Sequence, residues 1–242
     1  MRKITIILSV LVFIASGCGQ ATKKQSEVTN SKVDTELIDD LEQSQQCVPK
    51  EIICRILSQS EVEQLFTDEL KKTFDIQYPI WRVYAFGDNL GEYRIVLTES
   101  VNIQIDGNLI DTLHHNIKGF FFRLENNTLT KEREIYDFIN SGEISIWFWT
   151  KFCSFSDIDD DGLVDPIIVY GSKPKSDSES YRMNILVYFK GEKYAQRHTD
   201  GDLDFMRSTQ IDKDFYTLPK VIQENVKSIT EEMLENGNIL SW

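Results

Sequence analysis

The chain has 242 residues, with 39 acidic and 26 basic side chains, and its net charge is −13. This acidic excess argues against binding to nucleic acid and to anionic membrane surfaces, because both attract lysine and arginine. Beyond a polar N-terminal stretch the length leaves one domain of about 195 residues, which can bury enough surface to fold without a disulfide framework.

The chain begins with the pattern of a secretory signal peptide. Arg2 and Lys3 precede an apolar run from Ile4 to Ile14, and small residues follow. This order of a charged, an apolar and a small-residue region is typical of a cleaved leader. The apolar run is shorter than the roughly 20 residues that span a bilayer. We therefore expect residues 1–17 to be removed.

The leader ends in Ala15-Ser16-Gly17-Cys18, which resembles the bacterial lipobox. The resemblance implies that Cys18 carries diacylglycerol on its sulfur and becomes an acylated N-terminus, and several acyl chains make a lasting membrane anchor. Gly19 in place of aspartate is similar to outer-membrane sorting, if the host has two membranes. We expect a lipoprotein of the bacterial cell envelope, in the outer membrane and on either of its faces. An ordinary soluble secreted protein is the alternative.

Residues 18–46 are polar and contain no aromatic residue, so they predict a disordered tether before a single domain over 47–242. Cys47, Cys54 and Cys153 remain in a compartment that permits disulfides. A bridge between Cys47 and Cys54, near the start of the domain, is the favoured pairing. A bridge between Cys54 and Cys153, or three free thiols, remain open.

The domain should begin with an amphipathic helix over residues 60–74. Ser60 and Glu63 have the spacing of a capping box, and apolar residues then recur at helical intervals. At the other end of the chain, Pro219 predicts a helix start and Gly237 its end. The residues between them form one apolar stripe: Ile222, Val226, Ile229 and Met233.

Between these helices, runs of β-branched and aromatic residues predict strands. They cover residues 81–86, 93–98, 101–105, 117–124, 135–139, 145–155, 164–170 and 183–188. Turn residues separate them at 88–91, 106–108, 126–127 and 190–191. The short spacing leaves little room for crossover helices, which favours an antiparallel sheet. The expected fold class is α+β, a mostly antiparallel sheet with an N-terminal and a C-terminal helix packed on it.

Residues 157–165 match the pattern D-x-D-x-D-G-x-x-D, which is typical of a calcium loop. Alternate carboxylates supply the hard oxygens that Ca²⁺ requires, and Gly162 permits the sharp turn. The predicted ligands are the side chains or carbonyls of Asp157, Asp159, Asp161, Leu163 and Asp165.

Ile168 stands where an EF-hand has its bidentate glutamate, and the flanks predict strands. The loop instead resembles the aspartate loops of integrin-like and other secreted β repeats, which implies a weak, structural Ca²⁺ site. A solvated acidic turn is the alternative. A catalytic metal is disfavoured because no histidine accompanies the motif.

Two further patterns bear on glycans. Trp147 and Trp149 lie two residues apart in a predicted strand, so they share a face and either stack on sugar rings or pack in the core. A glycan hydrolase or lyase would need two carboxylates about 5 to 10 Å apart. The available candidates are Glu99, Glu132, Glu134 and Asp137.

Three stretches together resemble a family of bacterial lipoproteins and secreted proteins described as surface polysaccharide biosynthesis proteins. They lie at residues 81–99, 145–171 and 212–219, and the similarity covers residues 80–236. The resemblance implies a link to surface polysaccharide and transfers no catalytic residue. The leading hypothesis is a non-catalytic, lipid-anchored envelope protein that assists assembly or display of surface polysaccharide, with that polysaccharide or other envelope proteins as partners. A carboxylate-dependent glycan hydrolase or lyase is the alternative.

Overall fold

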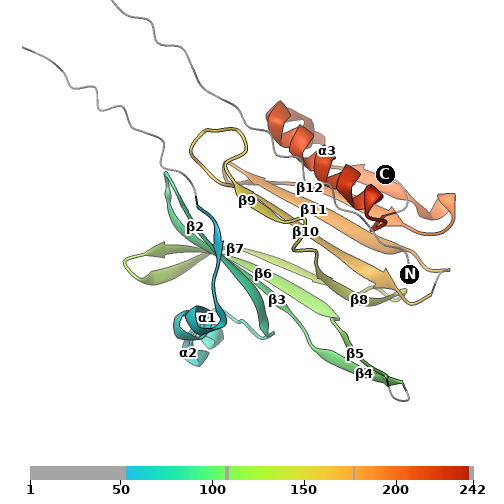
Figure 1. Ribbon diagram of the computed structural model, residues 1–242, viewed down its shortest axis with the longest axis horizontal. Coiled ribbons are helices and arrows are strands. Elements are labelled where there is room, and N and C mark those ends of the chain that lie inside the picture. Colours follow the sequence, from blue (N-terminus) through green and yellow to red (C-terminus); the bar gives the residue numbers. More distant parts are fainter. Residues whose placement is uncertain (1–52, 107–108, 177, 240–242) are drawn as a thin grey trace, which may run out of the picture. The chain divides into compact units, whose positions relative to one another are not determined.

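Figure 1 shows the computed structural model of the chain, which describes residues 53–106, 109–176 and 178–239. All of these belong to one unit, Gln46–Trp242. Two antiparallel sheets form the body of this unit. The prediction of a mostly antiparallel β domain with a C-terminal helix is therefore confirmed.

The first sheet has the strand order β1-β2-β3-β6-β7. Its strands are β1 (Arg55–Ile56), β2 (Ile80–Asp88), β3 (Gly91–Glu99), β6 (Asn116–Glu125) and β7 (Thr128–Phe138). Successive side chains of a strand point to opposite faces. Both faces of β6 are apolar. Phe121 lies on one face and belongs to one hydrophobic cluster, whereas Phe120 and Phe122 lie on the other face and belong to a second cluster. The sheet is thus covered on both faces.

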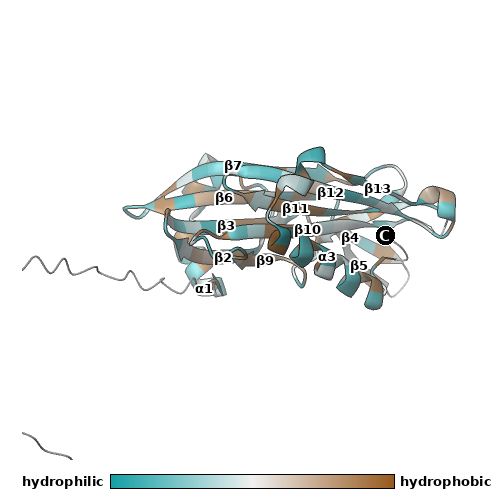
Figure 2. Ribbon diagram, turned by 90° about the horizontal axis from the view of Figure 1, so that it is seen from above, coloured by the Kyte–Doolittle hydropathy of each residue, from teal (hydrophilic) through white to brown (hydrophobic). Residues whose placement is uncertain are grey.

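Strand β7 forms one edge of the first sheet and is mainly hydrophilic (Figure 2). Residues 131–134 are all charged, so only the last part of this strand was predicted from the sequence. Charged side chains on an edge strand discourage pairing with another chain. The charged stretch therefore protects this edge.

The second sheet has the order β13-β12-β11-β10-β8, with β9 paired to β10. Its strands are β8 (Glu143–Phe148), β9 (Ser154–Ser156), β10 (Asp165–Pro174), β11 (Tyr181–Phe189), β12 (Glu192–Asp200) and β13 (Ser208–Ile211). The 3-10 helices η1 (Asp204–Met206) and η2 (Lys213–Thr217) flank β13. A separate hairpin of β4 (Asn102–Asp106) and β5 (Leu109–Leu113) interrupts the first sheet between β3 and β6.

The single strand predicted over residues 145–155 is wrong, because the chain turns after Phe148. The backbone N–H of Phe152 donates to the carbonyl of Trp149 at 2.9 Å and closes this turn. The turn places the Phe152 ring in the hydrophobic cluster that also holds Trp149. Burial of two large aromatic side chains therefore outweighs the strand propensity of the segment.

The single N-terminal helix predicted over residues 60–74 is also wrong. Two short helices form instead, α1 (Gln59–Leu65) and α2 (Asp68–Thr73). Ser58, not Ser60, is the N-cap of α1 and completes a capping box with Glu61. Phe66 is fully buried and ends α1. Thr67 then starts α2 by accepting the backbone N–H of Leu70.

The C-terminal helix α3 (Lys220–Glu235) begins after Pro219, as predicted. Ile222, Val226 and Met233 are buried on one stripe, and the fourth buried position is Thr230 rather than Ile229. Gly237 follows the helix with φ +68°, a conformation that glycine adopts at little cost.

Three hydrophobic clusters show how the elements are layered. One cluster joins the facing sides of the two sheets. A second lies between the first sheet and the segment of α1 and α2, and a third lies between α3 and the second sheet. Within this unit the order of layers is therefore helices, sheet, sheet and helix, which Figure 1 shows with α3 and α1 on opposite sides.

Candidate functional site

The aspartate loop connects β9 to β10, and Asp157 holds its backbone together. The carboxylate of Asp157 accepts the N–H of Asp161 at 3.0 Å and that of Gly162 at 2.7 Å. Gly162 has φ +87°, where a side chain is strained. The glycine in the motif therefore serves the turn for which it was predicted.

Three of the predicted ligands come together. Asp157, Asp159 and Asp165 each offer a carboxylate oxygen, and these three oxygens lie within 4.8 Å of one another. Asp165 is 1% exposed and accepts the N–H of Ile158 at 2.9 Å. Burial raises the pKa of Asp165 to about 6, and the charges of its neighbouring aspartates add to this effect.

One carboxylate oxygen of the triad lacks a hydrogen-bond partner among the described residues. It is the Oδ1 atom of Asp159, which is buried. Burial raises the pKa of Asp159, and so does the nearby charge of Asp161. A hard cation bound to the three oxygens would remove the repulsion and satisfy the buried oxygen. These residues therefore fit a metal ion.

The two other predicted ligands lie differently. Asp161 is not part of the triad, because its carboxylate forms an ion pair with Lys190 at 3.0 Å. The N–H of Leu163 donates to Asp161 at 3.0 Å. Three carboxylates therefore make up the preformed site.

The loop also joins the two sheets. The carbonyl of Gly162 accepts the N–H of Asn89 at 3.1 Å, and Asp88 accepts the N–H of Val164 at 3.3 Å. Asp88 and Asn89 belong to the β2–β3 turn of the first sheet, whereas Lys190 belongs to the β11–β12 turn of the second. Sequence reasoning treated both segments only as turns, and no local signal marks them as partners of the loop.

A cleft of about 390 Å³ opens beside the loop. Its walls include Phe86 and Tyr93 from the first sheet, Tyr188 from the second, and Leu163 from the loop. Its volume falls within the range of about 300 to 1,000 Å³ that is usual for small-molecule sites. The aspartate loop therefore forms one wall of a cleft between the sheets.

The described residues bear on only one of the cysteine pairings. Cys18 and Cys47 lie outside them, so lipidation and the Cys47–Cys54 bridge stay predictions. No disulfide joins Cys54 to Cys153. Burial raises the pKa of the Cys153 thiol to about 12, and this residue packs beside the core.

Three of the four carboxylates considered for glycan cleavage lie on β7, and the fourth, Glu99, lies at the end of β3. Asp137 pairs with Arg182, and Glu134 pairs with Lys131. Glu132 is exposed beside the loop cleft. Glu99 is buried and lines a different pocket, whose other lining residues include no carboxylate.

Comparisons of the chain with family models, with curated proteins and with solved structures find no match. Among the described residues, no helix has both the length and the apolar character needed to cross a membrane.

Proposed function

We propose that the protein is a lipid-anchored component of the bacterial cell envelope, with a β domain that a structural Ca²⁺ ion stabilises, and that it assists assembly or display of surface polysaccharide. The observation that carries the proposal is the triad of Asp157, Asp159 and Asp165 in a loop that bridges two sheets. A metal there would strengthen a junction of the fold.

The chemistry of the triad favours Ca²⁺ over softer metals. The three side chains offer only carboxylate oxygens, which suit hard cations, and no histidine or cysteine belongs to the group. The triad lacks the bidentate glutamate of an EF-hand. We therefore expect a Ca²⁺ dissociation constant on the order of 10⁻⁴ to 10⁻³ M, as in extracellular modules. Such a site is filled outside the cytoplasm, in agreement with the predicted leader.

The envelope location is supported by the N-terminal sequence. The leader and Cys18 supply an anchor, and residues 18–46 supply a polar tether. Loss of Arg2 and Lys3 with the leader makes the net charge −15, which disfavours nucleic acid as a partner. The link to polysaccharide is supported by the family resemblance.

A clean deletion of the gene in its own bacterium tests this function. The deletion strain should carry less polysaccharide at its surface, measured by labelling intact cells, and the wild-type gene supplied in trans should restore it. A gene carrying Cys18→Ser should restore less surface polysaccharide, because a protein without acyl chains is not held at the membrane by them. An unchanged amount of surface polysaccharide in the deletion strain would reject the proposed role.

A further inference from the structure

Three of the four tryptophans of the chain line one pocket. Trp81, Trp147 and Trp149 contribute to its wall, and its volume is about 410 Å³. The polar residues of the wall include Glu99, His114, Thr150, Lys151 and Asn238. A small-molecule site usually combines aromatic walls with a few polar groups in this way.

The three tryptophans are not equally committed to the core. Trp149 is 8% exposed, and its ring lies against Gly171, where an added Cβ would approach the ring to 2.5 Å. Trp147 is half-buried, with its ring centroid 6.2 Å from that of Trp149. Trp81 is 60% exposed. Core packing therefore explains Trp149 but not the exposed Trp81.

Polar groups line the pocket because they accept hydrogen bonds from the backbone of β8, the edge strand of the second sheet. The N–H of Phe148 donates to Glu99 Oε1 at 2.9 Å, and the N–H of Ile146 donates to the carbonyl of His114 at 2.7 Å. The Nε2 atom of His114 lies 3.6 Å from Glu99 Oε2. The edge of the second sheet is thus fastened by residues of the β3 end and the β5–β6 connection, and these residues form a polar wall.

We propose that this pocket binds a pyranose ring of a glycan chain, with Trp81 stacked on the ring and with polar groups of the wall bonded to its hydroxyl groups. A tryptophan ring offers a broad apolar face to the C–H face of a sugar. Because Lys151 is paired with Glu232 and Glu99 lies beside His114, the pocket suits a neutral sugar. The assignment deepens the proposed function, on which it rests, by naming the sugar-contacting surface.

Titration of the full chain with maltohexaose, cellohexaose and chitohexaose tests the assignment. The protein is kept in a detergent that has no sugar headgroup. Intrinsic tryptophan fluorescence and isothermal calorimetry follow binding. At least one oligosaccharide should give a saturable signal below about 10 mM. Trp81→Ala should weaken that binding at least about tenfold, because truncation of a tryptophan that anchors a ligand commonly costs more than the equivalent free energy.

Phe205→Ala is the matched control, because Phe205 is 84% exposed and lies outside the pocket wall. It should bind as wild type does, and Trp81→Tyr should retain part of the affinity. The assignment is overturned if no oligosaccharide gives a saturable signal, or if Trp81→Ala binds as tightly as Phe205→Ala.

The two proposals can fail separately. Binding that Trp81→Ala abolishes, together with unchanged polysaccharide in the deletion strain, would reject the envelope role and uphold the pocket. Absence of binding, together with a loss of surface polysaccharide on deletion, would reject the pocket alone.

Discussion

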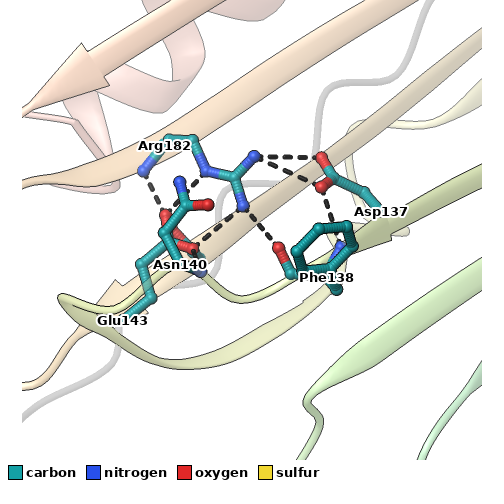
Figure 3. A network of polar contacts seen from close by, with 6 residues as sticks. Asp137, Phe138, Asn140, Glu143 and Arg182 are labelled. Atoms are coloured by element: carbon teal, nitrogen blue, oxygen red, sulfur yellow. Dashed lines mark hydrogen bonds and ion pairs between the residues drawn. The ribbon is translucent and has the colours of Figure 1, made fainter.

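Replacing Arg182 by methionine is expected to lower the free energy of unfolding by about 3 to 5 kcal/mol, the cost of removing one partner of a buried ion pair. Figure 3 shows Arg182 of β11 between Asp137 and Glu143. Its guanidinium donates to Glu143 at 2.7 and 2.9 Å, and it also bonds Asp137 and the Phe138 carbonyl. Glu143 is only 2% exposed, so the variant would leave a buried carboxylate without its cation.

The same network makes stability depend on pH. Burial raises the pKa of Glu143, but hydrogen bonds from Arg182, Ser172 and the Asn140 backbone outweigh burial and hold this pKa below its usual value. A carboxylate with a lower pKa in the folded state stabilises the fold above its unfolded pKa, and this stabilisation is lost as the pH falls through the folded pKa. The difference between wild type and Arg182→Met should therefore shrink in acid.

Urea unfolding at neutral pH measures the loss of stability in Arg182→Met, and the same comparison in acid measures how far the difference shrinks. Arg197→Met is the matched control, because Arg197 lies in the same sheet and pairs with Asp212 at 2.7 Å, but its side chain is 46% exposed. Exposed pairs contribute about 0 to 1 kcal/mol. Equal stability of the two variants would show that the Arg182 network contributes no more than a surface pair.

Replacing Phe66 by alanine is expected to destabilise the fold by a similar amount, about 3 to 5 kcal/mol. Phe66 is 0% exposed and lies where α1 ends. Its ring centroid is 5.9 Å from that of Phe122 on β6. The substitution would leave a cavity between the helices and the outer face of the first sheet.

Urea unfolding also tests this prediction, with Phe205→Ala as a matched control on the exposed surface. That control should change stability by less than about 0.5 kcal/mol. If Phe66→Ala were as stable as the control, the two N-terminal helices would not be part of the cooperative fold.

The sequence predicted those parts of the fold that a local pattern encodes. Apolar and aromatic runs marked most of β2, β3, β6, β10 and β11, and the Pro219 and Gly237 signals marked α3. Strand β12 was missed because residues 192–200 are mostly polar and carry no apolar run. The break at Phe66 was missed because its burial depends on β6, a strand far away in the sequence.

The candidate sites also contain parts that a local pattern predicted and parts that depend on distant segments. The spacing of Asp157, Asp159 and Asp165 predicted a cluster because the three ligands lie in one short loop. The pairing of Asp161 with Lys190 depends on how two separate turns meet, so spacing alone could not reveal it. The tryptophan pocket likewise needs Trp81 from the first sheet beside Trp147 from the second.

We infer that Ca²⁺ binds the aspartate triad and thereby stabilises the folded domain. Thermal unfolding of the full chain should be compared in 10 mM calcium and in chelator at matched ionic strength, because screening alone also stabilises an acidic protein. The variant is Asp159→Asn, since Asp157 and Asp165 also hold the loop backbone. Asp160→Asn is the control, because Asp160 is exposed and lies outside the triad.

At 10 mM calcium, about 10 to 100 times the expected dissociation constant, binding to the folded state alone adds about 1.4 to 2.7 kcal/mol, or roughly 3 to 10 °C in Tm for a domain of this size. We expect such an increase for wild type and Asp160→Asn, and a much smaller one for Asp159→Asn. No increase in wild type, or an equal increase in all three proteins, would contradict a calcium site in the loop.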